Sequence, residues 1–271
     1  MEDAEGDEEL ATVLVPAEIL AASPSAKDGV SAEAEKRHRV FGCELIQEAG
    51  ILLSLPQVVM VTAQNMLHRF YYRQPLTRFD ALSVAMGCTL LSSKIEEKPK
   101  MVRDVVFIFY FVYHVRRQTP EPRQLDLGGP VYTAWKNEVV NMERCVLKEL
   151  GFCLYRIMDH PHKYILYYIK ILDGSEALAQ AAWNYLNDSM RLDLCLRHPA
   201  GTLACAAIYL AARRIGFPLP RDGALPLPWH ALMHTSLDTM LAVASEILSL
   251  YHLDKLQWLP PLADCEYLAE T

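Results

Sequence analysis

The sequence lacks the local motifs by which most enzyme classes are recognised. It contains no G-x-S-x-G, no glycine-rich phosphate loop and no H-E-x-x-H. None of its seven cysteines forms a C-x-x-C pair, so neither a zinc ribbon nor a thioredoxin-like site is indicated. The two histidines of "DHPHK" (159–163) stand two residues apart and do not share a helix face. We therefore expect no enzyme, no small-molecule substrate, no metal and no cofactor.

Clustered positive charge and long apolar runs are missing as well. The 26 Lys and Arg against 33 Asp and Glu give a formal net charge of −7, whereas nucleic-acid binding requires basic residues that displace counterions. We therefore expect no direct nucleic-acid partner. No run of 18 apolar residues exists, and the acidic start "MEDAEGDEEL" does not resemble a signal peptide. A soluble, intracellular chain without a membrane partner is the expectation.

Helix-forming residues dominate what is present. Only 12 glycines stand among 271 residues, and 52% of the residues are hydrophobic, which predicts an all-α chain with a substantial core. Residues 1–36 show no sustained period and are expected to form a mostly disordered acidic tail. From Arg37 on, apolar residues recur at helical spacing. Helices are expected over 37–52 (with Phe41, Leu45, Ala49 and Leu52 on one face), 57–72, 77–96 and 131–150, the last closed by Gly151.

The stretch "VRDVVFIFYFVYHVRR" (102–117) is ambiguous between strand and helix. Its β-branched and aromatic residues favour a strand, whereas its length and charged ends favour a buried helix. We favour the helix, which makes five helices in the first half of the chain. Residues 77–96 are small or apolar nearly all round, which is typical of a helix at the centre of a bundle.

The second half of the chain repeats the first. "AQNML" from Ala63 aligns with "AWNYL" from Ala182, and "VAMGCTLLSSK" from Val84 aligns with "LACAAIYLAAR" from Leu203. The offset is 119 residues in both cases (182 − 63 and 203 − 84). A single offset that holds across two helices indicates a duplication. We therefore predict two tandem five-helix bundles, with the following divisions: a tail over 1–36, bundles over 37–155 and 156–259, and a short tail over 260–271.

Two charged residues stand in apolar surroundings. The residues one helical turn on either side of Glu143 are all apolar: Val139, Val140, Val146 and Leu147. Lys94 follows two leucines at the same spacing. Because a carboxylate among aliphatic side chains is costly unless it is paired, two interpretations stay open. Lys94 and Glu143 form a buried internal ion pair, or they are polar anchors of a docking surface. Glu96 and Glu97 are interpreted as a solvated helix end.

Several longer motifs resemble the cyclin family. "SSKIEE" is followed about fifty residues later by "MERCVLKELGF", as in a cyclin box, and the duplicated five-helix plan is the one that cyclins have. The stretches "GCELIQEAGILLSLPQVVM", "RFYY", "RDVV", "HPHK" and "WNYLNDSMR" are similar to cyclins of type L. The resemblance covers about residues 40–258, which is nearly all of the chain expected to be ordered.

The resemblance implies a regulatory subunit that binds and activates a cyclin-dependent protein serine/threonine kinase. For cyclins of type L the kinase is of the PITSLRE type, and the setting is transcription and pre-mRNA processing in the nucleus. Cyclins hold the kinase's mobile helix with a lysine and a glutamate, which match Lys94 and Glu143 here. Apolar kinase contacts carry over onto Leu91, Ile95, Leu147 and Phe152. The resemblance implies no catalytic residue in this chain.

The alternative is a transcription factor or adaptor with the same tandem fold that activates no kinase. Such factors usually carry a zinc ribbon and a basic surface that faces DNA. The sequence has neither a C-x-x-C pair nor a net positive charge. The Arg/Ser-rich tail that usually targets cyclin L to splicing bodies is not found in the 271 residues. Targeting to splicing bodies is therefore not carried over, and the nucleus is expected from the resemblance alone.

Overall fold

Helices and turns account for all regular structure in the part of the chain that the computed structural model describes. The described residues are 14–119, 125–152, 154, 157, 159–220, 227–253 and 257–268. These ranges contain no β-strand, so the all-α prediction is confirmed. The chain divides into two compact units, residues 1–158 with 255–271 (unit 1) and residues 159–254 (unit 2). The predicted division at 155/156 falls on residues outside the described ranges, close to this boundary.

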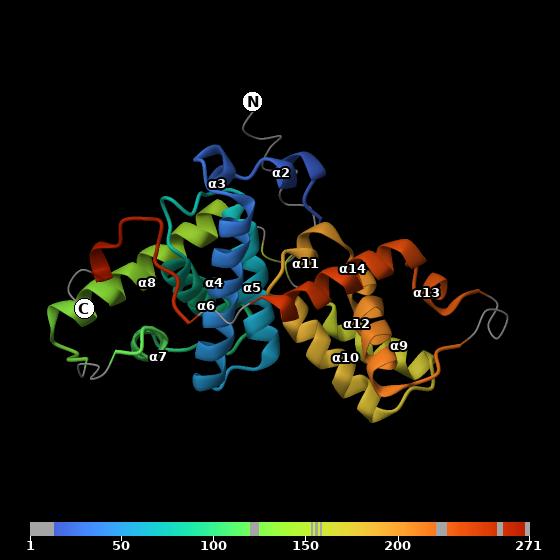
Figure 1. Cartoon of the computed structure of the whole chain (residues 1–271). Helices are drawn as coiled ribbons and strands as arrows, with labels where there is room; N and C mark the ends of the chain where they lie inside the picture. The colour runs from blue at the N-terminus through green and yellow to red at the C-terminus, as the bar shows by residue number, and fades with distance from the viewer. Residues whose placement is uncertain are drawn as a thin grey trace. The chain divides into compact units, whose positions relative to one another are not determined.

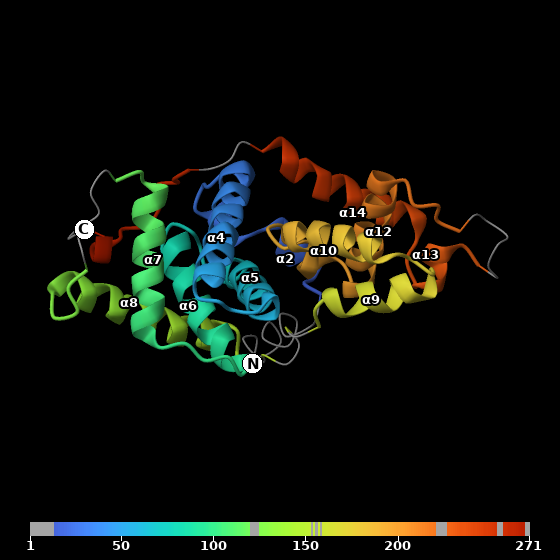
Figure 2. The ribbon, with the colours of Figure 1, turned by 90° about the horizontal axis from the view of Figure 1, so that it is seen from below.

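Unit 1 contains the five predicted helices of the first bundle (Figure 1): α4 (Ala32–Leu52), α5 (Gln57–Tyr71), α6 (Ala81–Ile95), α7 (Val102–Arg116) and α8 (Pro130–Glu149). α6 packs against the other four, and Figure 2 shows α4 and α7 beside it. All residues from 81 to 93 are buried, which confirms the prediction of a central helix. The ambiguous stretch 102–117 forms α7 and not a strand, because its buried aromatic side chains belong to the core of this bundle.

The ends of α6 and α8 follow from specific capping residues. The Asp80 side chain accepts hydrogen bonds from the backbone N–H groups of Leu82 (2.9 Å) and Ser83 (3.1 Å), so α6 begins at Ala81 and not at residue 77 as predicted. α8 ends as predicted at Gly151, whose φ of +62° a glycine adopts without strain. α6 ends differently, because Glu97 takes a left-handed φ of +55° there without being a glycine.

Unit 2 repeats part of this plan. Its long helices are α9 (His162–Ile171), α10 (Glu176–Ser189), α12 (Ala200–Ile215) and α14 (Leu237–Ser249), and its short ones are α11 (Leu194–Arg197) and α13 (Trp229–Leu232). α12 takes the central place and packs against α9, α10 and α14. The first residues of α5 and α10 are 119 apart (176 − 57), as are those of α6 and α12 (200 − 81). The tandem fold inferred from the sequence is therefore confirmed.

The chain before α4 differs from the prediction. Residues 1–13 lie outside the described ranges, but residues from 14 onward include α2 (Ala17–Ala21) and α3 (Pro24–Lys27). Ser25 is fully buried, and its hydroxyl accepts a hydrogen bond (3.0 Å) from the backbone N–H of Leu76. The predicted tail boundary at residue 36 is therefore too late. These contacts join residues some fifty positions apart, which no local period in the sequence reveals.

The end of the chain also packs on unit 1. The ring of Trp258 lies 5.5 Å from that of Phe41, edge to face, and the ring of Tyr267 lies 5.3 Å from that of Trp135. Tyr267 is only 7% exposed. The described part of 260–271, predicted as a short tail, is therefore part of the bundle, because the ring of Tyr267 anchors it there. Trp258, predicted within the second bundle, belongs to unit 1 as well.

Candidate functional site

Lys94 and Glu143 form an ion pair between the last turn of α6 and the second half of α8. The Nζ atom of Lys94 lies 2.5 Å from Oε1 of Glu143. The lysine side chain is 49% exposed and the glutamate side chain is 16% exposed. The structure thus contains the internal ion pair that the sequence allowed, and it leaves the cationic partner at the surface.

The surroundings of Glu143 are apolar on one side only. Val139 and Val146 are fully buried, whereas Val140 is 44% exposed and Leu147 is half-buried. An ion pair with one half-exposed member is screened by water, so it stabilises the fold by about 0–1 kcal/mol. This small contribution does not account for placing a carboxylate against two buried valines. A partner that excludes water would strengthen the same pair considerably.

The four apolar candidates lie near the C-terminal ends of α6 and α8, with Phe152 just after α8. They differ in exposure. Leu91 is 5% exposed and belongs to the core of unit 1. Ile95 and Leu147 are half-buried and pack against that core from outside. Phe152 is 69% exposed. Ile95, Leu147, Phe152 and the Lys94–Glu143 pair are hereafter called the α6/α8 surface, which Leu91 supports from beneath.

Phe152 has a backbone conformation that large residues rarely adopt. Its φ is +59°, directly after Gly151 at +62°. Its backbone N–H donates a hydrogen bond (3.2 Å) to the carbonyl of Leu147, which holds the turn in place. A left-handed conformation costs a non-glycine residue about 1–3 kcal/mol, and such costs concentrate at functional sites. The strained turn leaves an aromatic ring in solvent, where it contributes little to the fold.

Glu96 has a role that the sequence did not reveal. It was interpreted with Glu97 as a solvated helix end, and Glu97 is indeed exposed. Glu96, however, is half-buried and accepts a hydrogen bond (2.6 Å) from the hydroxyl of Thr62 on α5. This bond ties the end of α6, two residues after Lys94, to the neighbouring helix. The local pattern could not show it, because Thr62 lies 34 residues earlier in the chain.

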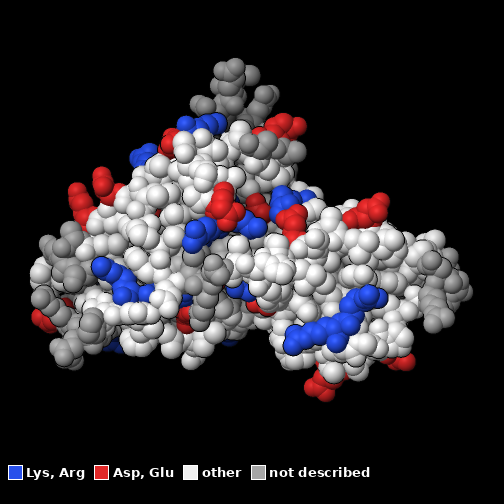
Figure 3. All heavy atoms as spheres, in the orientation of Figure 1, with Lys and Arg blue, Asp and Glu red and all other residues white. Residues whose placement is uncertain are grey.

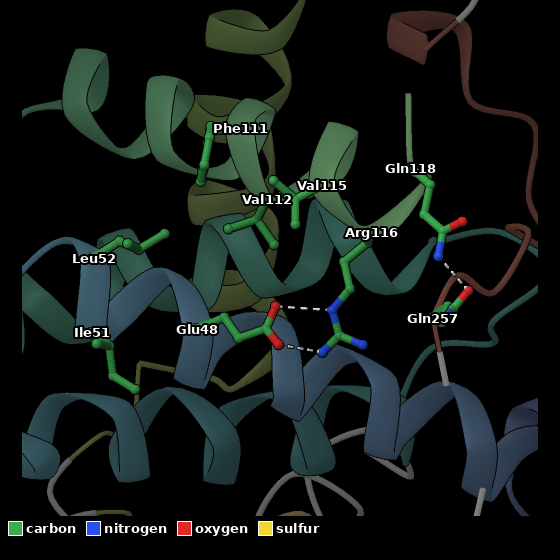
Figure 4. Close-up of a pocket in the computed structure, with 9 residues that line it drawn as sticks. All are labelled: Glu48, Ile51, Leu52, Phe111, Val112, Val115, Arg116, Gln118 and Gln257. Atoms are coloured by element: carbon green, nitrogen blue, oxygen red, sulfur yellow. Dashed lines mark hydrogen bonds and ion pairs between the residues drawn. The ribbon is translucent and has the colours of Figure 1, made fainter. Parts of the chain in front are cut away.

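An apolar hollow of about 460 Å³ lies elsewhere on unit 1, between the C-terminal halves of α4 and α7 (Figure 4). Four of its lining residues are well exposed: Ile51, Leu52, Phe111 and Val115. The inward face predicted for α4 is therefore wrong at Leu52, which is 47% exposed, because the helix ends there and the following Leu53 enters the core.

Two charged side chains, Glu48 and Arg116, also line this hollow. Arg116, with a side chain only 7% exposed, donates to Glu48 (2.6 Å) and to Glu44 (3.1 Å) on α4. Burial lowers the pKa of the Arg116 guanidinium, but the hydrogen bonds and negative charges of Glu48 and Glu44 outweigh that effect and raise it. The guanidinium is therefore always charged and serves as a structural bridge between α7 and α4.

The described ranges were compared with the requirements of a metal site and of a membrane-spanning helix. They hold no group of three or more His, Cys, Asp or Glu side chains placed to bind a metal ion. Within the same ranges, no helix combines the length and the apolar character that crossing a membrane requires. On the face drawn in Figure 3, the described Lys and Arg side chains lie in small separate groups, with Asp and Glu side chains near several of them.

Comparison with known proteins gives a consistent set of relatives. The family model for the cyclin N-terminal domain matches residues 17–155. Cyclin-L1 of Homo sapiens is 44% identical over 241 residues, which are 88% of this chain and 44% of that protein. Cyclin-L2 of Mus musculus is 41% identical over 245 residues, 89% of this chain and 46% of that protein. The chain thus spans about half the length of the curated relatives it matches.

Two solved structures share the fold at low sequence identity. The yeast RNA Pol II CTD kinase CTDK-1 complex contains a chain that matches with a TM-score of 0.67 at 16% identity, covering 95% of this chain and 81% of that one. The CAK complex from Chaetomium thermophilum contains one that matches with a TM-score of 0.56 at 17% identity, covering 78% and 62%. At such identities the likeness concerns the fold alone.

Proposed function

The chain belongs to the cyclin family, and on that basis we propose that it is a regulatory subunit that binds and activates a cyclin-dependent protein serine/threonine kinase. The observation that carries the proposal is the α6/α8 surface within a matched cyclin domain. There, a half-exposed lysine of α6 is paired with a carboxylate of α8, and an exposed Phe152 follows the end of α8. Both structural relatives come from complexes, and the first of these, CTDK-1, is a kinase complex.

The chain supplies binding energy in this proposal and no catalytic group. Protein kinases become active when a lysine–glutamate ion pair inside the kinase and an ordered activation loop are both in place. A subunit that binds only this arrangement shifts the kinase population towards it. Lys94 and Glu143 would be desolvated by the kinase, and Ile95, Leu147 and Phe152 would supply apolar contact around them.

The identity of the kinase and its setting are the finer part of the proposal. The relatives named Cyclin-L1 and Cyclin-L2 favour a kinase of the PITSLRE type, acting in transcription and pre-mRNA processing in the nucleus. The CTDK-1 complex is a kinase of the RNA Pol II CTD, which agrees with a role in transcription. Because the chain covers 44% of Cyclin-L1, the activity of a full-length relative is extended to it only as a proposal.

The proposal is tested by measuring binding and activation with the kinase that co-purifies from a nuclear extract. Lys94→Ala should weaken binding by about 1–3 kcal/mol, roughly fivefold to 150-fold, because a charged contact inside the interface is lost. Glu143→Ala should act in the same direction. Arg213→Ala is the matched control, since Arg213 is the exposed cation 119 positions after Lys94 in the second repeat. It should change the affinity less than twofold.

The fold must be followed in the same variants. Since the pair contributes about 0–1 kcal/mol to stability, the melting temperature of Lys94→Ala should fall by no more than about 4 °C. A large fall in both variants would assign the pair to the fold. If no kinase co-purifies and none gains activity on adding the chain, the proposed function is wrong. Binding without activation would instead indicate an adaptor.

A further inference from the structure

We propose that Gly87 is a positioning residue for the α6/α8 surface, because its missing side chain lets the backbone of α8 approach α6 at Glu143. This inference rests on the proposed function. A Cβ atom placed on Gly87 would lie 2.8 Å from the carbonyl carbon of Met142 and 2.9 Å from the backbone nitrogen of Glu143. Carbon atoms prefer to be about 3.5–4.0 Å apart. The two helices could therefore not hold this separation with any side chain at position 87.

The obstacle at Gly87 is backbone, which distinguishes it from other buried glycines of unit 1. A Cβ on Gly42 would meet the Cδ1 atom of Leu67 at 2.7 Å, and one on Gly50 would meet the sulfur of Met60. Both of those atoms end flexible side chains that can rotate away. The peptide between Met142 and Glu143 cannot rotate without breaking the hydrogen bonds of α8. Relief at Gly87 therefore requires α8 to shift as a body, by roughly 0.5–1 Å.

The close contact lies next to the residues of the proposed docking surface. Gly87 and Lys94 are seven residues apart, about two turns, so they share one face of α6. Glu143 itself forms the contact with Gly87, and Leu147 follows one turn later on α8. The long side chain of Lys94 can follow a displaced carboxylate. The spacing between Ile95 on α6 and Leu147 on α8 cannot adjust in this way, so a partner that contacts both helices would detect the shift.

The helix propensity of alanine and its close contact with α8 should change the stability of Gly87→Ala in opposite directions, which makes the inference testable. In a helix interior, alanine is favoured over glycine. If the space beside Gly87 were open, Gly87→Ala would stabilise unit 1 and leave binding unchanged. If Gly87 packs closely against the backbone of α8, Gly87→Ala should instead destabilise unit 1 and weaken kinase binding. The two effects are separated by measuring both quantities on the same protein.

The experiment compares Gly87→Ala with Gly42→Ala in the full chain, using the co-purifying kinase as the probe. Gly87→Ala should raise the concentration needed for half-maximal activation at least tenfold, with maximal activity at saturating chain unchanged. Gly42→Ala should stay within threefold, because only a leucine end must move. In a Lys94→Ala background the effect of Gly87→Ala should be less than additive, since both changes act on one contact surface.

Several outcomes would overturn the inference. If the kinase binds Gly87→Ala as tightly as the unmodified chain while Lys94→Ala is impaired, Gly87 does not position the surface, and the proposed function still stands. If the unmodified chain binds no kinase, the proposed function itself fails. Should Gly87→Ala not fold, Met142→Val perturbs the same contact more mildly and should weaken binding about threefold to tenfold. Unchanged affinity in that variant would also contradict the inference.

Discussion

The central helices of the two repeats are equivalent in sequence and place but differ at two positions that decide what each helix can do. Lys94 of α6 corresponds to Arg213 of α12, and Gly87 corresponds to Ala206, at the common offset of 119. Lys94 pairs with a carboxylate on α8, whereas Arg213 is exposed and forms no ion pair with any described residue. A duplicated helix thus carries the charge pair in one copy only.

The difference lies in the neighbouring helix as much as in the central one. α8 is 20 residues long and continues past Glu143 to the strained turn at Phe152, while α14 ends after 13 residues. α12 also ends at Gly216, which adopts its left-handed φ without strain, whereas α6 ends at Glu97 with a similar φ. A left-handed non-glycine residue therefore follows each helix of the α6/α8 surface, as one also does after α4 and α7 in unit 1. The second repeat has the same kind of strain at Asp173 and His234, but its central helix ends at a glycine instead.

The largest expected effect tests whether the two units fold independently. Trp135 is fully buried in unit 1, against the rings of Tyr110, Tyr113 and Tyr267. Trp135→Ala should lower the stability of unit 1 by about 3–5 kcal/mol, since a large cavity replaces the indole. Hydrogen exchange followed by mass spectrometry should show faster exchange in α4–α8 and unchanged exchange in α9–α14. Equal losses of protection in both units would show that they unfold together.

Acid should weaken unit 2 through His162. Burial, with a smaller opposing hydrogen bond to Asn187, lowers the pKa of His162 from 6.5 to about 4. The folded state therefore binds the proton less readily than the unfolded chain. The associated stability is complete above pH 6.5 and is lost as the pH falls from 6.5 to about 4, by at most roughly 3 kcal/mol.

The pH effect is measured by urea unfolding of unit 2 at a series of pH values. His162→Gln should flatten the decline between pH 6.5 and 4, because glutamine carries no titratable proton and can still donate to Asn187. The exposed His252 provides the control, and His252→Gln should leave the decline intact. A decline that persists in His162→Gln would assign the acid sensitivity to other groups.

Each unit contains an arginine that bridges two carboxylates, and burial should decide which bridge matters more. The side chain of Arg116 is 7% exposed beside Glu44 and Glu48. Arg197 is 27% exposed and bridges Asp193 on the same helical turn to Glu246 on α14. Arg116→Met should cost about 2–3 kcal/mol, because it removes a buried cation from beside Glu44, whose side chain is only 16% exposed. Arg197→Met should cost about 1 kcal/mol. Equal losses in urea unfolding would contradict this order.

The sequence predicted what depends on local pattern, and it missed what depends on distant contacts. Periodicity and the 119-residue offset gave the central helices and the tandem plan, and the apolar ring around Glu143 pointed to the ion pair. The hydrogen bond from Thr62 to Glu96 joins two helices at a distance that no spacing encodes. Trp258 packs on Phe41 from the far end of the chain for the same reason. The exposure of apolar residues also came only from the structure. Leu91 and Phe152 are both apolar in the sequence, but Leu91 is buried in the core and Phe152 is exposed to solvent.

The smallest expected effect on kinase affinity, none at all, separates the two repeats most directly. Ala206 is fully buried in α12 at the position that Gly87 occupies in α6. Ala206→Gly removes a buried methyl group and lowers helix propensity, so unit 2 should lose about 1–2 kcal/mol of stability. The affinity for the kinase should stay unchanged, because the α6/α8 surface belongs to unit 1 alone. A raised dissociation constant for Ala206→Gly, measured by calorimetry beside Gly87→Ala, would mean that the second repeat also contributes to kinase binding. Both repeats would then contribute to kinase binding, to different extents.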